Sequence, residues 1–217
     1  MAIAPSNPDI VYQCLGTSYE STSERGIWKS TDGGTTWTQI KSGLNFSGND
    51  EARWGGECIV IHPANENEIW VGSRAGGLWK SLDAGSNWTQ VAAATFGTLV
   101  TSTICIHPSF PDQIWVGGEG GAWVSTDHGA TWTLKQSMAR VWRIVRKSNG
   151  TTFINGGNAS PGAITDVKLY RVTASDWASP ATYAFTDVWQ NWLNAHQAAY
   201  FWKPVEYNPG LTVLADG

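Results

Sequence analysis

The chain has few charged residues and no excess of basic ones. Only 15% of its 217 residues are charged, and 14 Lys and Arg accompany 18 Asp and Glu, so the formal net charge at pH 7 is −4. A nucleic-acid-binding face needs a dense group of basic side chains, and we therefore expect no nucleic-acid partner. An apolar run long enough to span a bilayer, about 18 residues, is also absent, so no contact with a membrane is expected.

The chain is also poor in cysteine and in helical periodicity. Its three cysteines, Cys14, Cys58 and Cys105, lack the spacing of a metal site, and each lies in an apolar segment typical of a strand. We expect buried free thiols, and no metal and no cofactor. Residues 1–5 lack the basic start and apolar core of a secretory signal, so we expect no signal peptide in this chain and leave its localisation unknown.

One eight-residue pattern, S-x-D-x-G-x-x-W, occurs three times, at residues 30–37, 81–88 and 125–132. Its aspartates are 51 and then 44 residues apart. Repeats of this length are typical of β-propeller blades or solenoid units. The pattern therefore predicts a repeat architecture.

The residues of this pattern suit a tight turn between two strands. Glycine adopts a positive φ at little steric cost, the Ser and Asp side chains cap turn amides, and the Trp closes the apolar layer. We therefore interpret Asp32, Asp83 and Asp127 as structural and not catalytic. His62 and His107 precede turn prolines and are interpreted as turn residues, not metal ligands. His128 replaces a residue of the third copy and is expected to be exposed.

A template of four short strands surrounds each copy of the pattern. A strand, a Pro- or Asn-containing turn and a second strand precede a glycine loop; the third strand leads into the pattern, and a fourth follows. Four antiparallel strands per unit are typical of a propeller blade. Closed propellers usually need about four to eight blades, and most of this class need about six or more. The chain has room for about four to five, so we expect an incomplete piece. The blades of this single partial propeller, 1–217, are expected at about 1–45, 46–97, 98–137 and 138–190, with another starting at 191–217.

The binding face of such a propeller is expected at one rim, in the loops between second and third strands and between blades. These loops gather tryptophans, carboxylates and arginines. They suit a sugar chain, because pyranose CH groups stack on indole while hydroxyls bond charged groups. The alternative is an ordinary rim whose tryptophans pack between loops. The candidate substrate-binding residues are Arg53, Trp54, Glu57, Arg74, Glu119 and Trp142.

The repeated pattern is that of the Asp-box, or bacterial neuraminidase repeat, and the chain resembles the all-β propellers that carry it. It is most similar to N-terminal propeller blades of glycoside hydrolase family 74, the xyloglucanase type. The resemblance covers residues 1–135 well and 136–217 loosely, and it implies a seven-bladed parent propeller. The segments that carry it are AIAPSNPDIVY (2–12), GIWKSTDGGTTW (26–37), EARWGGECIVIHP (51–63) and IWVGSRAGGLWKSLDAGSNW (69–88).

The resemblance implies inverting hydrolysis of β-1,4-glucan backbones, which needs an acid and a base about 6.5–9.5 Å apart. The family's first-blade phrase, Asp-x-Gly-Gly-Ala-Tyr, is not matched, because the nearest segments, which begin at Arg74 and at Glu119, place no aspartate at that position. No catalytic residue is therefore carried over, and whether this chain is itself an enzyme stays open.

The expected role is that of a fragment that contributes rim to a cleft for a β-glucan or xyloglucan-type polysaccharide. The other expected partner is a second propeller domain missing from this chain, or a second copy of the chain. A parent protein that follows the family would be secreted.

Two other functions stay open. Non-catalytic Asp-box propellers, such as sortilin-type receptors and photosystem assembly factors, act as protein- or glycan-binding modules. Sialidases also carry Asp-boxes, but they need an arginine triad that begins with an Arg-Ile-Pro motif. This sequence contains no Arg-Ile-Pro.

Overall fold

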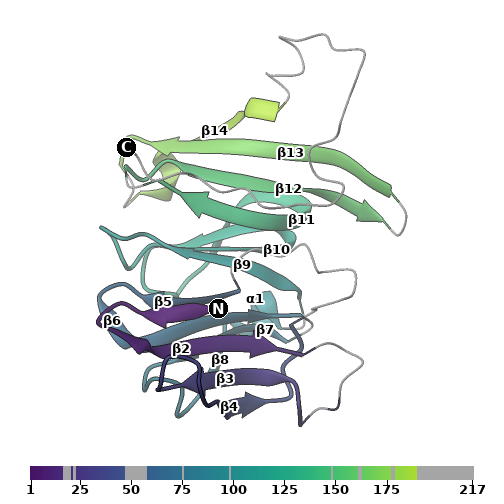
Figure 1. Cartoon of the computed structure of the whole chain (residues 1–217). Helices are drawn as coiled ribbons and strands as arrows, with labels where there is room; N and C mark the ends of the chain where they lie inside the picture. Colours follow the sequence, from purple (N-terminus) through teal and green to yellow (C-terminus); the bar gives the residue numbers. More distant parts are fainter. Residues whose placement is uncertain are drawn as a thin grey trace.

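The computed structural model describes residues 1–16, 21, 23–46, 58–74, 76–97, 99–147, 149–160, 163–176 and 179–189, with the backbone alone at 158–160 and 163–166. These residues form three antiparallel sheets that are stacked one on another (Figure 1). This confirms the predicted all-β class with four-stranded antiparallel blades. No helix in the described ranges is long and apolar enough to cross a membrane.

The first two sheets follow the predicted four-strand template. The first has the order β1 (Ala2–Ala4), β2 (Asn7–Leu15), β3 (Gly26–Ser30) and β4 (Thr38–Ser42). The second has the order β5 (Ile59–His62), β6 (Asn65–Ser73), β7 (Gly77–Ser81) and β8 (Thr89–Val91), and the short helix α1 (Ala93–Phe96) follows it.

The third sheet has six strands, because its long strands change partner along their length. Residues 114–118 of β10 pair with β9, and residues 119–124 pair with β11. Strand β11 in turn pairs with β10 up to Arg140 and with β12 from Arg140 onward. The limits of the third and fourth blades therefore stay a prediction. The remaining elements are β9 (Thr101–Ile106), β10 (Ile114–Ser125), β11 (Thr133–Arg146), β12 (Thr152–Ser160), β13 (Ala163–Ala174), the 3-10 helix η1 (Pro180–Thr182) and β14 (Tyr183–Asp187).

Each copy of the repeated pattern forms a hydrogen-bonded turn between two strands. In the first copy the Ser30 hydroxyl donates to Asp32 Oδ1 at 2.7 Å and accepts from the Gly34 amide at 2.8 Å. Asp32 Oδ1 also accepts from the Thr36 amide at 2.8 Å, and Trp37 Nε1 donates to the Gly34 carbonyl at 2.9 Å. The corresponding bonds recur in the second and third copies. The aspartates are therefore occupied by turn amides, as predicted.

Two apolar clusters lie between successive sheets, and a third lies within the six-stranded sheet, where Trp115 of β10 packs with residues of β11 to β13. Trp70 and Trp115, at equivalent positions of β6 and β10, are both 0% exposed. Trp70 packs with Leu78 and Phe96 of its own unit and with Ile104 of the next. Each sheet is thus stabilised by the apolar surface it buries against its neighbour.

The expected turn role of His62 and His107 is confirmed. His62 Nδ1 accepts from the Ala64 amide at 3.3 Å, and His107 Nδ1 accepts from the Ser109 amide at 3.0 Å. Burial, with the nearby Arg146 guanidinium, lowers the pKa of His107 to about 4. His107 is therefore neutral at pH 7 and able to accept the bond.

The carboxylates of the repeated turns should make the fold sensitive to acid. Hydrogen bonds from Thr131, chiefly from its hydroxyl, lower the pKa of Asp127 from its ordinary 3.8 to about 2. Since folding favours the ionised form, this stabilisation is complete above about pH 4 and is lost as the pH falls toward 2. Asp127→Asn keeps an acceptor oxygen but does not ionise, so its melting temperature should fall less steeply between pH 4 and 2 than that of the wild type.

Asp9→Asn, which removes a carboxylate outside the repeated turns, is the control, and melting curves followed by circular dichroism give the measurement. Identical slopes for the wild type and Asp127→Asn would show that this turn does not set the acid sensitivity.

Two leucines allow a matched test of the core. Leu78 is 0% exposed and Leu82 is 60% exposed. Leu78→Ala removes buried methyl groups next to Trp70 and Phe96, and should lower the free energy of unfolding by about 2–5 kcal/mol. Leu82→Ala should change it by about 0.5 kcal/mol or less. Urea denaturation measures both; equal losses would contradict the assigned core.

Candidate functional site

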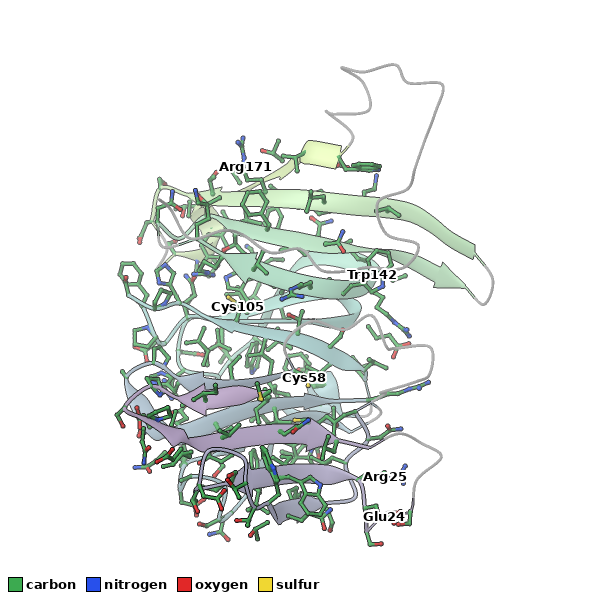
Figure 2. The ribbon with its side chains drawn as sticks, viewed as in Figure 1. Glu24, Arg25, Cys58, Cys105, Trp142 and Arg171 are labelled. Carbon is green, nitrogen blue, oxygen red and sulfur yellow. The ribbon has the colours of Figure 1, made fainter. Side chains whose placement is uncertain are left out.

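The candidate rim lies on the side of the sheets opposite to the Asp-box turns. Strands β2 and β6 end there, and β3 and β7 begin there (Figure 1). Arg25, at the start of β3, and Trp142 of β11 lie on this side in Figure 2. The Arg25 carbonyl accepts from the Gly43 amide at 2.9 Å. The rim is therefore built from the segments at the start and end of regular strands, as the repeat template predicts.

A backbone bridge connects the first and second sheets at the candidate rim. Asn45 and Arg74 form an isolated antiparallel bridge, with the Arg74 amide donating to the Asn45 carbonyl at 2.8 Å. The Arg74 side chain is half-buried. The bridge holds this candidate residue at the point where the two blades meet.

An acid–base pair links the next two units at the same rim. Glu119 Oε1 is 3.8 Å from Arg140 Nη2, with the two side chains 45% and 16% exposed. The backbone amide of Glu119 donates to the Val100 carbonyl at 2.9 Å, and Glu119 Oε2 accepts from the Val100 amide at 3.5 Å. These contacts fix a half-exposed carboxylate and a guanidinium side by side, a donor and acceptor set that suits hydroxyl groups.

The register of β11 against β10 places Arg140 next to Glu119. Arg140 is opposite Glu119 on one side of β11 and opposite Gly157 on the other. Arg140 was not among the six candidates. Strand β10 changes its partner from β9 to β11 next to Gly120 and Gly121, which both have a positive φ. The spacing of residues in the sequence therefore does not reveal that Glu119 pairs with Arg140.

The interpretation of Trp142 as an exposed, ligand-stacking ring is corrected by its burial. The residue is only 1% exposed, and it is among the largest fully buried side chains of the described ranges. The sequence signal was its place in a loop between blades, whereas the structure places it inside the 14-residue strand β11. This ring is therefore part of the packing, the alternative stated for such tryptophans.

The remaining candidates, Arg53, Trp54 and Glu57, lie outside the described residues. Their assignment to the substrate-binding rim stays a prediction. The described part of the candidate rim thus consists of Arg74, Glu119 and Arg140, which joins the candidates through its contact with Glu119.

A second concave surface lies along the first strands of three successive units. It is a groove of about 380 Å³ between β5, β9 and the second half of β11. Most of its lining is apolar, including Val60, Ile104 and Ile144, with Arg143 and Arg146 at one side. Sequence analysis missed it, because it requires three blades to stand next to one another.

Repeated antiparallel sheets that pack face to face, each with an S-x-D-x-G-x-x-W turn between two of its own strands, define this molecule as a β-propeller protein. A family model described as Sortilin, neurotensin receptor 3 (Sortilin-Vps10) matches residues 17–197. The chain belongs to this family.

Curated relatives and solved structures also include family 74 enzymes. The chain is 31% identical to a xyloglucanase of a Paenibacillus species over 223 residues, which is 92% of this chain and 20% of that protein. It is 32% identical to a xyloglucanase of Hypocrea jecorina over 136 residues, 61% of this chain and 16% of that protein. The chain therefore spans about a fifth of the length of these relatives.

A solved structure supports the same resemblance. The family 74 enzyme of Niastella koreensis superposes with a TM-score of 0.73 at 26% identity, over 86% of this chain and 29% of that one. The resemblance to family 74 propeller blades is thus confirmed in sequence and in fold.

The burial of Trp142 predicts that its loss destabilises the fold. Trp142→Ala should lower the free energy of unfolding by about 3–5 kcal/mol, because it leaves a cavity in the packed interior. Urea denaturation gives the value, with Trp142→Phe as the milder variant. If Trp142→Ala instead weakens oligosaccharide binding at unchanged stability, the ring is available to ligand and the correction made above fails.

Proposed function

We propose that this chain is part of a glycoside hydrolase that acts on β-1,4-glucans of the xyloglucan type. In this proposal it contributes substrate-binding rim and not a complete active site. The observation that carries it is the resemblance to the Paenibacillus xyloglucanase over 92% of this chain but only 20% of that protein. The wider likeness to the Niastella koreensis enzyme supports the same assignment.

The described rim supports a binding role. Glu119 and Arg140 place a carboxylate and a guanidinium together at the meeting of two blades, with Glu119 about half exposed. Charge-assisted hydrogen bonds from such a pair to sugar hydroxyls are stronger than neutral ones. Arg74 supplies a second guanidinium at the neighbouring junction between blades. Together they would hold a polysaccharide chain across successive blades.

The same residues do not make a hydrolytic centre. Inverting hydrolysis needs a carboxylic acid that protonates the leaving oxygen and a carboxylate that activates water, about 6.5–9.5 Å apart. Glu119 is engaged by Arg140 and by the Val100 amide. Arg74, in the corresponding segment one unit earlier, carries no carboxylate. We therefore assign both positions to binding and place the acid and the base elsewhere in the parent protein.

Titration calorimetry of the 217-residue chain with a xyloglucan heptasaccharide tests the binding role. Glu119→Gln and Arg74→Ala should each weaken binding about 5- to 10-fold, which corresponds to the net contribution of one typical hydrogen bond. Leu82→Ala, in the Asp-box turn on the opposite side, is the control and should bind as the wild type does. Unchanged affinity in both rim variants would remove these residues from the site.

A reducing-end assay on xyloglucan tests the other half of the proposal. The chain alone should release no sugar above background, whatever its affinity for the oligosaccharide. Robust turnover would contradict the proposal that the active site is incomplete.

A second candidate function is a protein-binding propeller, which the Sortilin-Vps10 match over residues 17–197 favours. Absence of binding to both xyloglucan and cello-oligosaccharides would make this candidate the leading one. The groove between β5, β9 and β11 would then be the first surface to examine, because it is apolar and open.

A further inference from the structure

Two histidines and a glutamate meet where the second sheet packs against the third unit. His62 ends β5, Glu68 lies in β6, and His128 belongs to the third Asp-box turn. One ligand atom from each residue lies within 4.8 Å of those of the other two. His62 and Glu68 are 4% and 3% exposed, while the His128 side chain is 34% exposed. The cluster is thus mostly buried, with access from solvent past His128.

We propose that this cluster binds a divalent transition-metal ion, and that zinc fits it best. The proposal gives His62 a role beyond its turn hydrogen bond and revises the expectation, drawn from the sequence, that the chain holds no metal. Imidazole nitrogens with one carboxylate are a donor set that zinc uses, with three protein ligands and a fourth position left for water. Harder ions such as magnesium prefer oxygen ligands alone. The exposed side of His128 offers the place for the fourth ligand.

The surroundings of the cluster orient two of the three ligands. His128 Nδ1 lies 3.0 Å from Asp112 Oδ1, so a proton on Nδ1 is held there and Nε2 points to Glu68. Trp70 Nε1 donates to Glu68 Oε1 at 2.6 Å. A carboxylate behind a ligating histidine is a common support of zinc sites, because it fixes the tautomer and the ring orientation.

Metal binding requires only local rearrangement. His128 Nε2 lies 2.7 Å from Glu68 Oε1, which is the distance of a hydrogen bond with a proton between the two atoms. Zinc replaces that proton and needs ligand distances of about 2.0–2.2 Å, so the two side chains separate slightly. His62 makes two long hydrogen bonds, to the Ala64 amide and the Pro111 carbonyl, each 3.3 Å. To bind the ion, one ring nitrogen of His62 gives up one of these two weak hydrogen bonds.

The site joins two neighbouring blades. His62 and Glu68 belong to the second unit, whereas His128 and Asp112 belong to the third. The equivalent position of the first two Asp-box turns is occupied by Gly33 and Ala84, which carry no ligand atom. An ion bound here by the folded chain would stabilise the contact between these two blades. The cluster lies on the side of the Asp-box turns, away from the sugar-binding rim, and its function is independent of the one proposed above.

Thermal unfolding of the whole chain, first freed of metal with EDTA, tests the proposal. Zinc chloride should raise the melting temperature and bind with a stoichiometry of one, while magnesium chloride should do neither. His128→Ala should abolish the zinc-dependent shift. This variant introduces the residue that the second turn carries at the same left-handed position, where Ala84 has a φ of 55°, so the turn should still form.

Two further measurements separate this site from other ways of holding zinc. Asp112→Asn should bind zinc about 10- to 100-fold more weakly, because it removes the support behind His128. Cobalt(II) should give the visible absorption of a four-coordinate site without a thiolate charge-transfer band, and Glu68→Gln should lose that absorption.

Each measurement can overturn the proposal. It fails if zinc leaves the wild-type melting temperature unchanged, if His128→Ala keeps the full shift, or if the cobalt spectrum shows thiolate ligands. The last result would assign the ion to the cysteines instead.

Discussion

The hydrogen bonds of the Asp-box turn are the constraint on which the rest of the structure depends. Each turn satisfies its own amides with a serine hydroxyl and an aspartate carboxylate, and so sets where the third strand ends and the fourth begins. The turn also bonds to the first hairpin of its own unit, since the Gly33, Ala84 and His128 amides donate to the carbonyls of Asp9, Asn67 and Asp112. The two turns on the same side of each blade are thereby held together.

Residues of the second and third Asp-box turns also pack against side chains of the preceding blade. A Cβ on Gly129 would lie 2.5 Å from the Trp70 ring of the preceding unit, and one on Gly85 would lie 2.4 Å from Ile40. At Gly129 the close approach of the rigid indole ring favours glycine in addition to the positive φ, whereas at Gly85 the positive φ is the stronger reason, because the Ile40 side chain can move. Because each blade buries apolar surface only against its neighbours, stability accumulates from contact to contact, as in other repeat proteins. The two sides of the blades are then free to differ, one carrying the rim and the other the His62–Glu68–His128 cluster.

Much of the fold could be predicted, because its signals are local. Ser30, Asp32 and Trp37 bond within a few residues of one another, so their pattern is sufficient to predict the turn. The site was less predictable. Trp142 follows a loop-like segment yet is buried, and Glu119 pairs with Arg140 through a strand that changes partner. His128, expected to be exposed, instead contacts Glu68 of the preceding unit. Each of these outcomes depends on contacts between segments far apart in the sequence.

The amino-acid sequence by itself determined the repeat, the turn chemistry, the antiparallel order of strands within the first two sheets and the resemblance to family 74 blades. The turn chemistry and the strand order follow from short-range hydrogen bonding and from the two-residue period of a strand, and the family resemblance follows from the phrases between the repeats. Only the tertiary structure decided which side chains of adjacent blades meet. That choice is set by the rotation of one sheet against the next, which brings His62 to His128 with ring centroids 5.0 Å apart although 66 positions separate them.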